Sequence, residues 1–76
     1  MEQQQERHGN FTLALVIPCY NEEEALPATL DQLTGLMHRM VGGNAIADYL
    51  LVMVDDGSKD RTWQIIAQHH DQDPHI

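Results

Sequence analysis

Basic residues are scarce in this sequence. Four Lys and Arg stand against twelve Asp and Glu among its 76 residues, which gives a formal net charge of −8 at pH 7. The four cations are scattered along the chain: Arg7, Arg39, Lys59 and Arg61. A negative field of this kind repels phosphate backbones and anionic lipid headgroups. We therefore expect no nucleic-acid partner.

Cysteine and long apolar runs are scarce too. Cys19 is the only thiol, which excludes an internal disulfide and favours a reducing compartment. Residues 1–10 are polar, lack the apolar centre of a signal peptide, and are expected to be a flexible lead-in. The longest apolar run, residues 49–54, is far shorter than the ~20 residues of a membrane-spanning helix. These absences predict a soluble, cytoplasmic chain without a membrane segment.

Strand and helix signals alternate along the rest of the chain. Residues 11–17 (FTLALVI) form an apolar run that ends at Pro18, and residues 49–54 (YLLVMV) form a second that ends at Asp55. Runs this short, bounded by proline or turn residues, favour buried strands over helices. Their continuous apolarity is typical of parallel strands that are covered on both faces.

A helical signal follows each run. Residues 27–40 are predicted to be a helix because five apolar side chains recur at spacings of three and four, namely Leu26, Leu30, Leu33, Met37 and Met40. Asp60 is a suitable N-cap for a second helix through residue 70, in which Trp63 is expected to join the core. The order strand, helix, strand, helix predicts two neighbouring parallel strands joined by a crossover.

Polar motifs stand at the end of each predicted strand. The first is Pro18-Cys19-Tyr20-Asn21-Glu22 and the second is Asp55-Asp56-Gly57-Ser58. Ligands of open α/β sheets bind at the carboxyl ends of the strands, and neighbouring strands lie only ~5 Å apart. An aromatic ring and carboxylates suit a nucleoside, which offers a flat base, N–H groups and ribose hydroxyls. No glycine-rich phosphate cradle follows either strand, so an acidic site of this kind would rely on a divalent cation to hold phosphates.

Two longer segments carry a family resemblance. VIPCYNEEE at residues 16–24 and VDDGSKDRT at residues 54–62, roughly thirty residues apart, resemble the opening of family-2 glycosyltransferases of the GT-A fold. Within that family, the two motifs most resemble those of the polyprenyl- and dolichyl-phosphate sugar transferases. The resemblance covers residues 11–76 and implies an α/β, Rossmann-like βαβα fragment of a GT-A nucleotide-binding domain with parallel strands.

The resemblance implies a role for individual residues. Pro18 and Tyr20 would flank the base, Glu22 would bind the ribose, Val54 would pack against the base, and Asp56 would accept a hydrogen bond from it. The other motif residues are given supporting roles. Strand alternation turns Asp55 to the opposite face, where it stabilises the turn, and Ser58, Asp60 and Thr62 cap the second helix. Glu23 and Glu24 complement the positive end of the first helix.

The implied function belongs to an intact enzyme. It would transfer a sugar from a UDP- or GDP-linked donor to an acceptor such as a polyprenyl phosphate, with Mg²⁺ or Mn²⁺ as cofactor, at the cytoplasmic face of a membrane. The family's metal-binding Asp-x-Asp and its acceptor residues come later than this segment, so we assign no catalytic residue and no metal ligand here. We expect the chain to be truncated, inactive alone and prone to self-association. The alternatives are a non-catalytic nucleotide-binding module and an inactive gene remnant.

Several residues also have simpler interpretations. Tyr20 on its own could be an ordinary buried aromatic, and Asp55-Asp56-Gly57 a common turn. Cys19 is expected to be a small buried hydrophobe, and the histidines His69, His70 and His75 to be solvated. Asp71-Gln72-Asp73 has the letters of the metal motif, but we interpret it as a linker because it closes a predicted helix.

Overall fold

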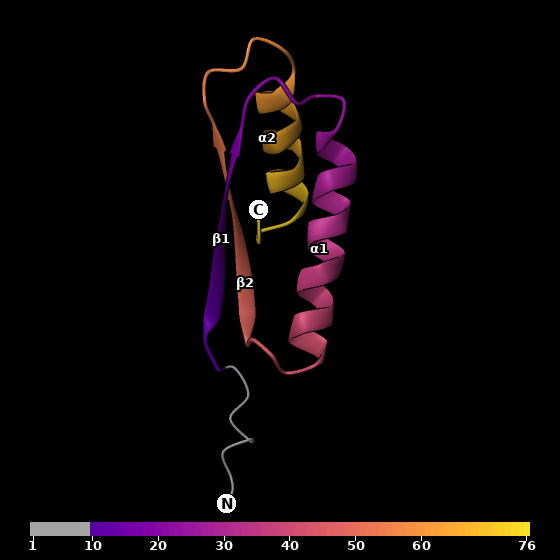
Figure 1. The fold of residues 1–76 in the computed structure, drawn as a ribbon, viewed down its shortest axis with the longest axis vertical. Helices are drawn as coiled ribbons and strands as arrows, with labels where there is room; N and C mark the ends of the chain where they lie inside the picture. Colours follow the sequence, from indigo (N-terminus) through magenta and orange to yellow (C-terminus); the bar gives the residue numbers. More distant parts are fainter. Residues whose placement is uncertain (1–9) are drawn as a thin grey trace, which may run out of the picture.

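The computed structural model describes residues 10–76, so the lead-in predicted for residues 1–10 lies, apart from Asn10, outside the described residues. The order of elements is β1 (Thr12–Cys19), α1 (Leu26–Gly42), β2 (Asp48–Asp55) and α2 (Thr62–Gln72). Figure 1 shows both strands pointing the same way, with the loops that follow them at one end of the molecule. The predicted α/β class with a βαβα order is confirmed.

The two strands are parallel neighbours, as the sequence predicts. The register pairs Thr12 with Asp48 at one end and Cys19 with Asp55 at the other. Both strands are longer than their apolar runs, and β1 continues through Pro18. Proline has no N–H to offer, which β1 tolerates because it is paired on one side only within residues 10–76.

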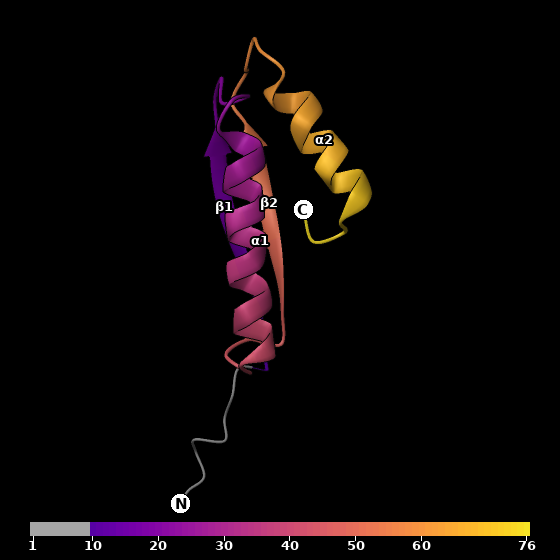
Figure 2. The same ribbon diagram turned by 90° about the vertical axis from the view of Figure 1, so that its right-hand side faces the viewer.

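Side chains alternate between two faces of the strand pair, which we call the inner and the outer face. The inner face carries Leu13, Leu15, Ile17 and Cys19 from β1 and Tyr49, Leu51 and Met53 from β2. Both helices lie to this side of the strands, with α1 across the pair and α2 beside β2 (Figures 1 and 2). The outer face bears the exposed Val16, Leu50 and Val54. Within residues 10–76 the outer face is therefore left uncovered, although the apolarity of both runs is typical of strands covered on both faces.

The core lies between the inner face and α1. The predicted apolar stripe of α1 supplies the buried Leu26, Leu30 and Met37, while Leu33 and Met40 are partly buried against them. Trp63 was expected in the core, but its side chain is 56 % exposed. It lines an apolar groove of about 360 Å³ along β2.

The helix ends differ slightly from the sequence prediction. Helix α1 starts at Leu26, so Pro27 occupies its first turn, where a missing N–H costs nothing. Its end is closed by backbone bonds, and Asn44, with φ of 64°, makes the left-handed turn that follows. Helix α2 starts at Thr62, with Arg61 and not Asp60 at the N-cap. Neither helix of residues 10–76 is both long enough and apolar enough to cross a membrane.

Candidate functional site

The carboxyl ends of the strands bring two predicted site residues side by side. Pro18 and Val54 are register partners, and both are exposed on the outer face. Paired residues of neighbouring strands lie about 5 Å apart, so these two form a small apolar platform. A flat ring could pack on it without displacing any core side chain.

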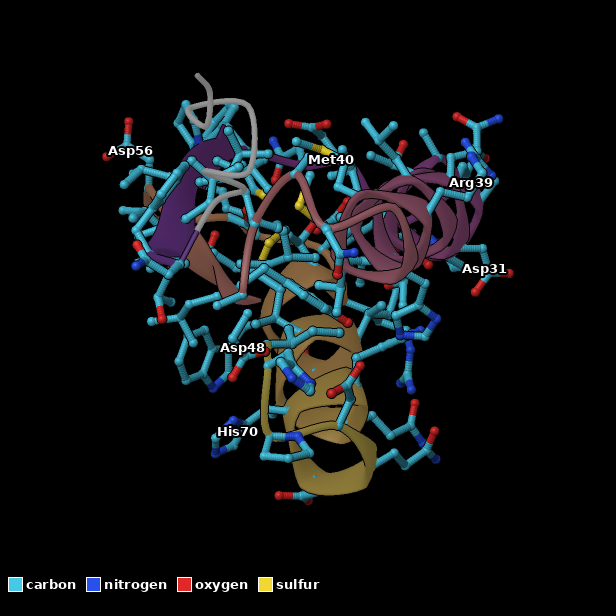
Figure 3. All side chains as sticks on the ribbon, turned by 90° about the horizontal axis from the view of Figure 1, so that it is seen from below. Asp31, Arg39, Met40, Asp48, Asp56 and His70 are labelled. Carbon is cyan, nitrogen blue, oxygen red and sulfur yellow. The ribbon has the colours of Figure 1, made fainter. Side chains whose placement is uncertain are left out.

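Tyr20 and Asp56 come two residues beyond this platform. Tyr20 is 53 % exposed, which excludes its interpretation as an ordinary buried aromatic. Asp56 is exposed too, and Figure 3 shows its carboxylate pointing away from both helices. Its backbone N–H donates to the Cys19 carbonyl at 2.9 Å, which continues the pairing of the strands and ties Asp56 to the end of β1. Tyr20 and Asp56 therefore follow the paired ends of the two strands, and both residues are exposed.

Glu22 and Asp55 occupy two different positions around that edge. Glu22 is exposed, and its Oε2 accepts a hydrogen bond from the Tyr20 backbone N–H at 3.1 Å. The Asp55 carboxylate is half-buried on the opposite face from Asp56, where it accepts bonds from the backbone N–H and the hydroxyl of Ser58. Gly57 completes this turn with φ of +79°, a conformation that side chains disfavour. Asp55 thus has the turn-stabilising role predicted for it.

The loop after β1 (residues 20–25, the first loop) and the loop after β2 (residues 56–61, the second loop) are bonded to each other. The Asn21 N–H donates to the Ser58 hydroxyl at 2.9 Å, and the Lys59 N–H donates to Asn21 Oδ1 at 2.8 Å. Glu23 makes a second pair of hydrogen bonds to the second loop, since its N–H donates to Asp60 and its Oε1 accepts from the Arg61 N–H. The backbones of the two motifs are therefore joined through side chains from both.

Thr62 anchors this junction in the interior. It is fully buried, and its hydroxyl accepts from the Glu22 N–H at 2.8 Å and donates to Asp60 Oδ1. The same Asp60 oxygen accepts the Thr62 N–H at 2.9 Å, which satisfies the first N–H of α2 although Asp60 is not the N-cap. The hydrogen bond from the Thr62 hydroxyl is the main reason that the pKa of Asp60 lies below its ordinary value.

Sequence reasoning missed how the two motifs are joined. It gave Asn21 no function, made Glu23 a solvated helix-end charge, and made Ser58 a helix cap, whereas all three link the loops. A signal was available: both motifs are rich in short polar side chains that can accept from loop N–H groups, and such groups need partners. The sequence alone did not show which groups would be hydrogen-bonded to each other, because the partners lie 37 to 40 residues apart.

The acidic side chains near the site do not form a metal centre by themselves. A surface depression of about 440 Å³ is lined by residues 21–25 and Asp60. Within residues 10–76, however, no three His, Cys, Asp or Glu side chains converge as metal ligands. The described residues therefore do not fit a bound Mg²⁺ or Mn²⁺ without further ligands.

Two other predicted assignments can be compared with the structure. Cys19 is 2 % exposed, and burial, followed by the charges of Glu22 and Asp55, raises the pKa of its thiol, so it is the buried hydrophobe that was expected. His75 is not simply solvated, because its ring lies 2.8 Å from Asp73 and 3.0 Å from Asp48. Asp73, one of the two carboxylates in the Asp71-Gln72-Asp73 segment, is thus engaged by His75.

Comparison with known proteins identifies the family of this α/β chain. The glycosyl transferase family 2 domain matches residues 14–76, and the chain therefore belongs to that family. It is 48 % identical over 56 residues, 72 % of this chain, to the "Uncharacterized glycosyltransferase YkoT" of Bacillus subtilis (strain 168). No solved structure matches it.

Two further relatives are named for lipid-phosphate sugar transfer. The chain is 34 % identical over 64 residues to the "Dolichyl-phosphate beta-glucosyltransferase ALG5A" of Trichomonas vaginalis. It is 37 % identical over 65 residues to the "Undecaprenyl-phosphate 4-deoxy-4-formamido-L-arabinose transferase" of Yersinia pestis (strain Pestoides F). Each match covers 84 % of this chain. The chain spans only about a fifth of the length of these relatives, at 17–20 %.

Proposed function

We propose that the intact protein transfers a sugar from a UDP- or GDP-linked donor to a polyprenyl phosphate, and that this chain binds the base and ribose of the donor. The observation that carries the proposal is the exposed Pro18–Val54 pair, with Tyr20 and Asp56 at the same edge. The names of two relatives, a dolichyl-phosphate and an undecaprenyl-phosphate transferase, support the acceptor class. A cytoplasmic location, with the intact form at a membrane face, belongs to the same proposal.

Each proposed contact has a physical basis. The base packs on the apolar platform of Pro18 and Val54 and against the Tyr20 ring. The Asp56 carboxylate accepts a hydrogen bond from a base N–H, which an ionised acceptor strengthens. Glu22 uses one oxygen to hold the Tyr20 N–H, so its other oxygen is available for a ribose hydroxyl. Mg²⁺ or Mn²⁺ would neutralise the diphosphate in the intact enzyme, and no contact proposed for this chain depends on the ion.

The binding proposal is tested by titrating the isotope-labelled chain with UDP and GDP and following its amide chemical shifts. Shifts are expected at Tyr20, Glu22 and Asp56, with weak affinity. Asp56→Ala should reduce binding, whereas Glu24→Ala is a matched acidic control, because Glu24 is exposed and makes no side-chain hydrogen bond within the described residues. Binding that survives Asp56→Ala and disappears with Glu24→Ala would show that the residue assignment is wrong.

Binding without transfer is the second candidate function for the chain alone. It is favoured by the lack of a converging metal-ligand set within residues 10–76. Incubation with UDP- and GDP-sugars, Mn²⁺ or Mg²⁺ and a polyprenyl phosphate is therefore expected to yield no product above the blank. Turnover that is lost with Asp71→Asn or Asp73→Asn would instead identify Asp71-Gln72-Asp73 as a metal motif.

A further inference from the structure

We propose that Asn21 is a positioning residue, which joins the two loops so that Tyr20 and Glu22 face the same site as Asp56. This inference rests on the nucleotide-binding function proposed above and adds a residue to it. Asn21 does not need to touch the nucleotide. It acts by fixing the backbone between two residues that do.

The backbone of Asn21 has an unusual conformation. Its φ of 49° lies in the left-handed region, where a side chain normally costs energy and where asparagine is among the better tolerated residues. The chain bends here, directly between Tyr20 and Glu22. The directions of both neighbouring side chains therefore depend on Asn21 keeping its conformation, in addition to the bond from the Glu22 N–H to Thr62.

Two hydrogen bonds to the second loop hold Asn21 in place. Its N–H donates to the Ser58 hydroxyl at 2.9 Å, and its Oδ1 accepts from the Lys59 N–H at 2.8 Å. One bond uses the backbone of Asn21 and the other uses its side chain, so both translation and rotation of the residue are restricted. The partners lie 37 and 38 residues away, which makes the arrangement a link between the motifs and not a local turn.

Ser58 extends the link to the end of β2. Its hydroxyl can donate one bond and accept others, and it donates to Asp55 Oδ1 while it accepts from Asn21. Asp55 is the register partner of Cys19, so the link starts at the paired ends of the strands. A continuous path, Asp55 to Ser58 to Asn21, thus sets Tyr20 and Glu22 relative to Asp56, the residue that follows Asp55.

The position of Asn21 also makes its effect separable from folding. The residue is exposed and belongs to no core contact, so its bonds contribute little to the free energy of unfolding. A binding site is more sensitive, because a misdirected ring or carboxylate loses its contact with the ligand. We therefore expect variants to lose nucleotide affinity more than stability.

Three variants of the full chain test the proposal. Asn21→Gly keeps the left-handed backbone and removes the Oδ1 acceptor, Ser58→Ala removes the hydroxyl, and Ser58→Thr keeps it. UDP and GDP affinities are measured by amide shifts, stability by urea unfolding, and loop order by hydrogen exchange of the Tyr20 and Glu22 amides without nucleotide. The first two variants should bind about 3- to 10-fold more weakly and exchange these amides faster, while Ser58→Thr restores both values.

The combined variant sharpens the test. If Asn21 and Ser58 act through one link, the double variant Asn21→Gly, Ser58→Ala should bind UDP and GDP only slightly more weakly than either single variant does. Wild-type affinity in both single variants, or equal losses in binding and in core amide protection, would overturn the positioning role. Absence of nucleotide shifts in the wild type would overturn the proposed function instead. In that case the exchange rates of Tyr20 and Glu22 in Ser58→Ala decide the positioning role: faster exchange supports it, and unchanged exchange refutes it.

Discussion

The inner and outer faces of the strand pair are built from similar residues but differ in how far they are buried. On β2, Leu51 is 1 % exposed on the inner face, whereas its neighbour Leu50 is 40 % exposed on the outer face. On β1, Cys19 is 2 % exposed and Val16 is 63 % exposed. Composition does not distinguish these faces, so the difference comes from where α1 and α2 pack. The inner face contributes stability, and the outer face of the described residues is open to solvent.

The same division continues past the ends of the strands. Asp55, turned to the inner side, accepts bonds from Ser58 and supports its own turn. Pro18 and Val54 lie on the outer face and form the candidate base platform. A site built from outer-face residues can change without disturbing the core. Stability and binding should therefore respond to different substitutions.

The largest expected effect separates the two faces directly. Leu51→Ala removes a fully buried side chain from the core and should lower the free energy of unfolding by about 2–5 kcal/mol, enough to unfold a small domain. Leu50→Ala, one residue away, should cost less than about 1 kcal/mol because much of that side chain is already in water. Urea unfolding followed by circular dichroism measures both. Equal losses would mean that the outer face is covered in solution.

A smaller effect is expected at the buried hydroxyl of Thr62. Thr62→Val keeps the volume but leaves the Glu22 N–H without its partner, which should cost about 1–3 kcal/mol. Thr34→Val is the matched control, since the Thr34 hydroxyl only donates to the Leu30 carbonyl of its own helix. A loss at position 62 no greater than at position 34 would show that the two loops are not joined through this hydroxyl.

The sequence predicted the order of elements, the parallel strands and the meeting of the two motifs, since apolar periodicity and strand ends are local signals. It did not predict which face of the strands is open. Val16 and Leu50 belong to apolar runs that suit either a buried or an exposed face. Nor did it predict the exposure of Trp63, because how many side chains surround a residue of α2 depends on how all the elements pack together. The bonds of Asn21 were missed for the same reason: their partners are distant in sequence.

Self-association should depend on the outer face. Exposed apolar side chains there, such as Val16 and Leu50, favour contact between copies, while the net charge of −8 opposes it. Val16→Lys should weaken association about tenfold, and added salt should strengthen association of the wild type by screening the charge. Sedimentation at several salt concentrations tests this. Gln32→Lys makes the same charge change on an exposed position of α1 and should have the smaller effect.

The smallest expected effect concerns pH, at the end of β2 farthest from the candidate site. The His75 ring stacks on the inner-face Tyr49 with centroids 4.2 Å apart, and His38 of α1 approaches that tyrosine edge-on at 5.9 Å. The His75 ring nitrogens contact Asp73 and Asp48, the latter beside the C-terminal turn (Figure 3). The bond to Asp73 is the largest cause that raises the pKa of His75 above 6.5, and Asp48 adds to it.

The direction of the pH effect follows from these shifts. A raised histidine pKa means that the stabilisation is complete below pH 6.5 and is lost as the pH rises through the folded-state value. Burial raises the pKa of Asp73, but the hydrogen bonds from His75 outweigh burial, so that the pKa lies below 3.8. The stabilisation that Asp73 contributes is therefore complete above pH 3.8 and is lost as the pH falls through its folded-state pKa. The contact should therefore be strongest between about pH 3.8 and 6.5. Because both side chains remain partly in solvent, the pair is expected to contribute only about 0.2–1 kcal/mol.

Histidine ring shifts measured against pH test this last expectation. Asp73→Asn should lower the pKa of His75 more than Asp48→Asn does, because the Asp73 bond is the larger cause. Asp71→Asn, on the exposed side of α2, is the control and should leave that pKa unchanged. The Leu51 N–H, which donates to the His75 carbonyl at 2.6 Å, gives a second readout, since its exchange corrected for intrinsic rate should quicken above the histidine pKa. A His75 pKa at or below 6.5, unaffected by either substitution, would mean that the C-terminal turn does not hold this contact in solution.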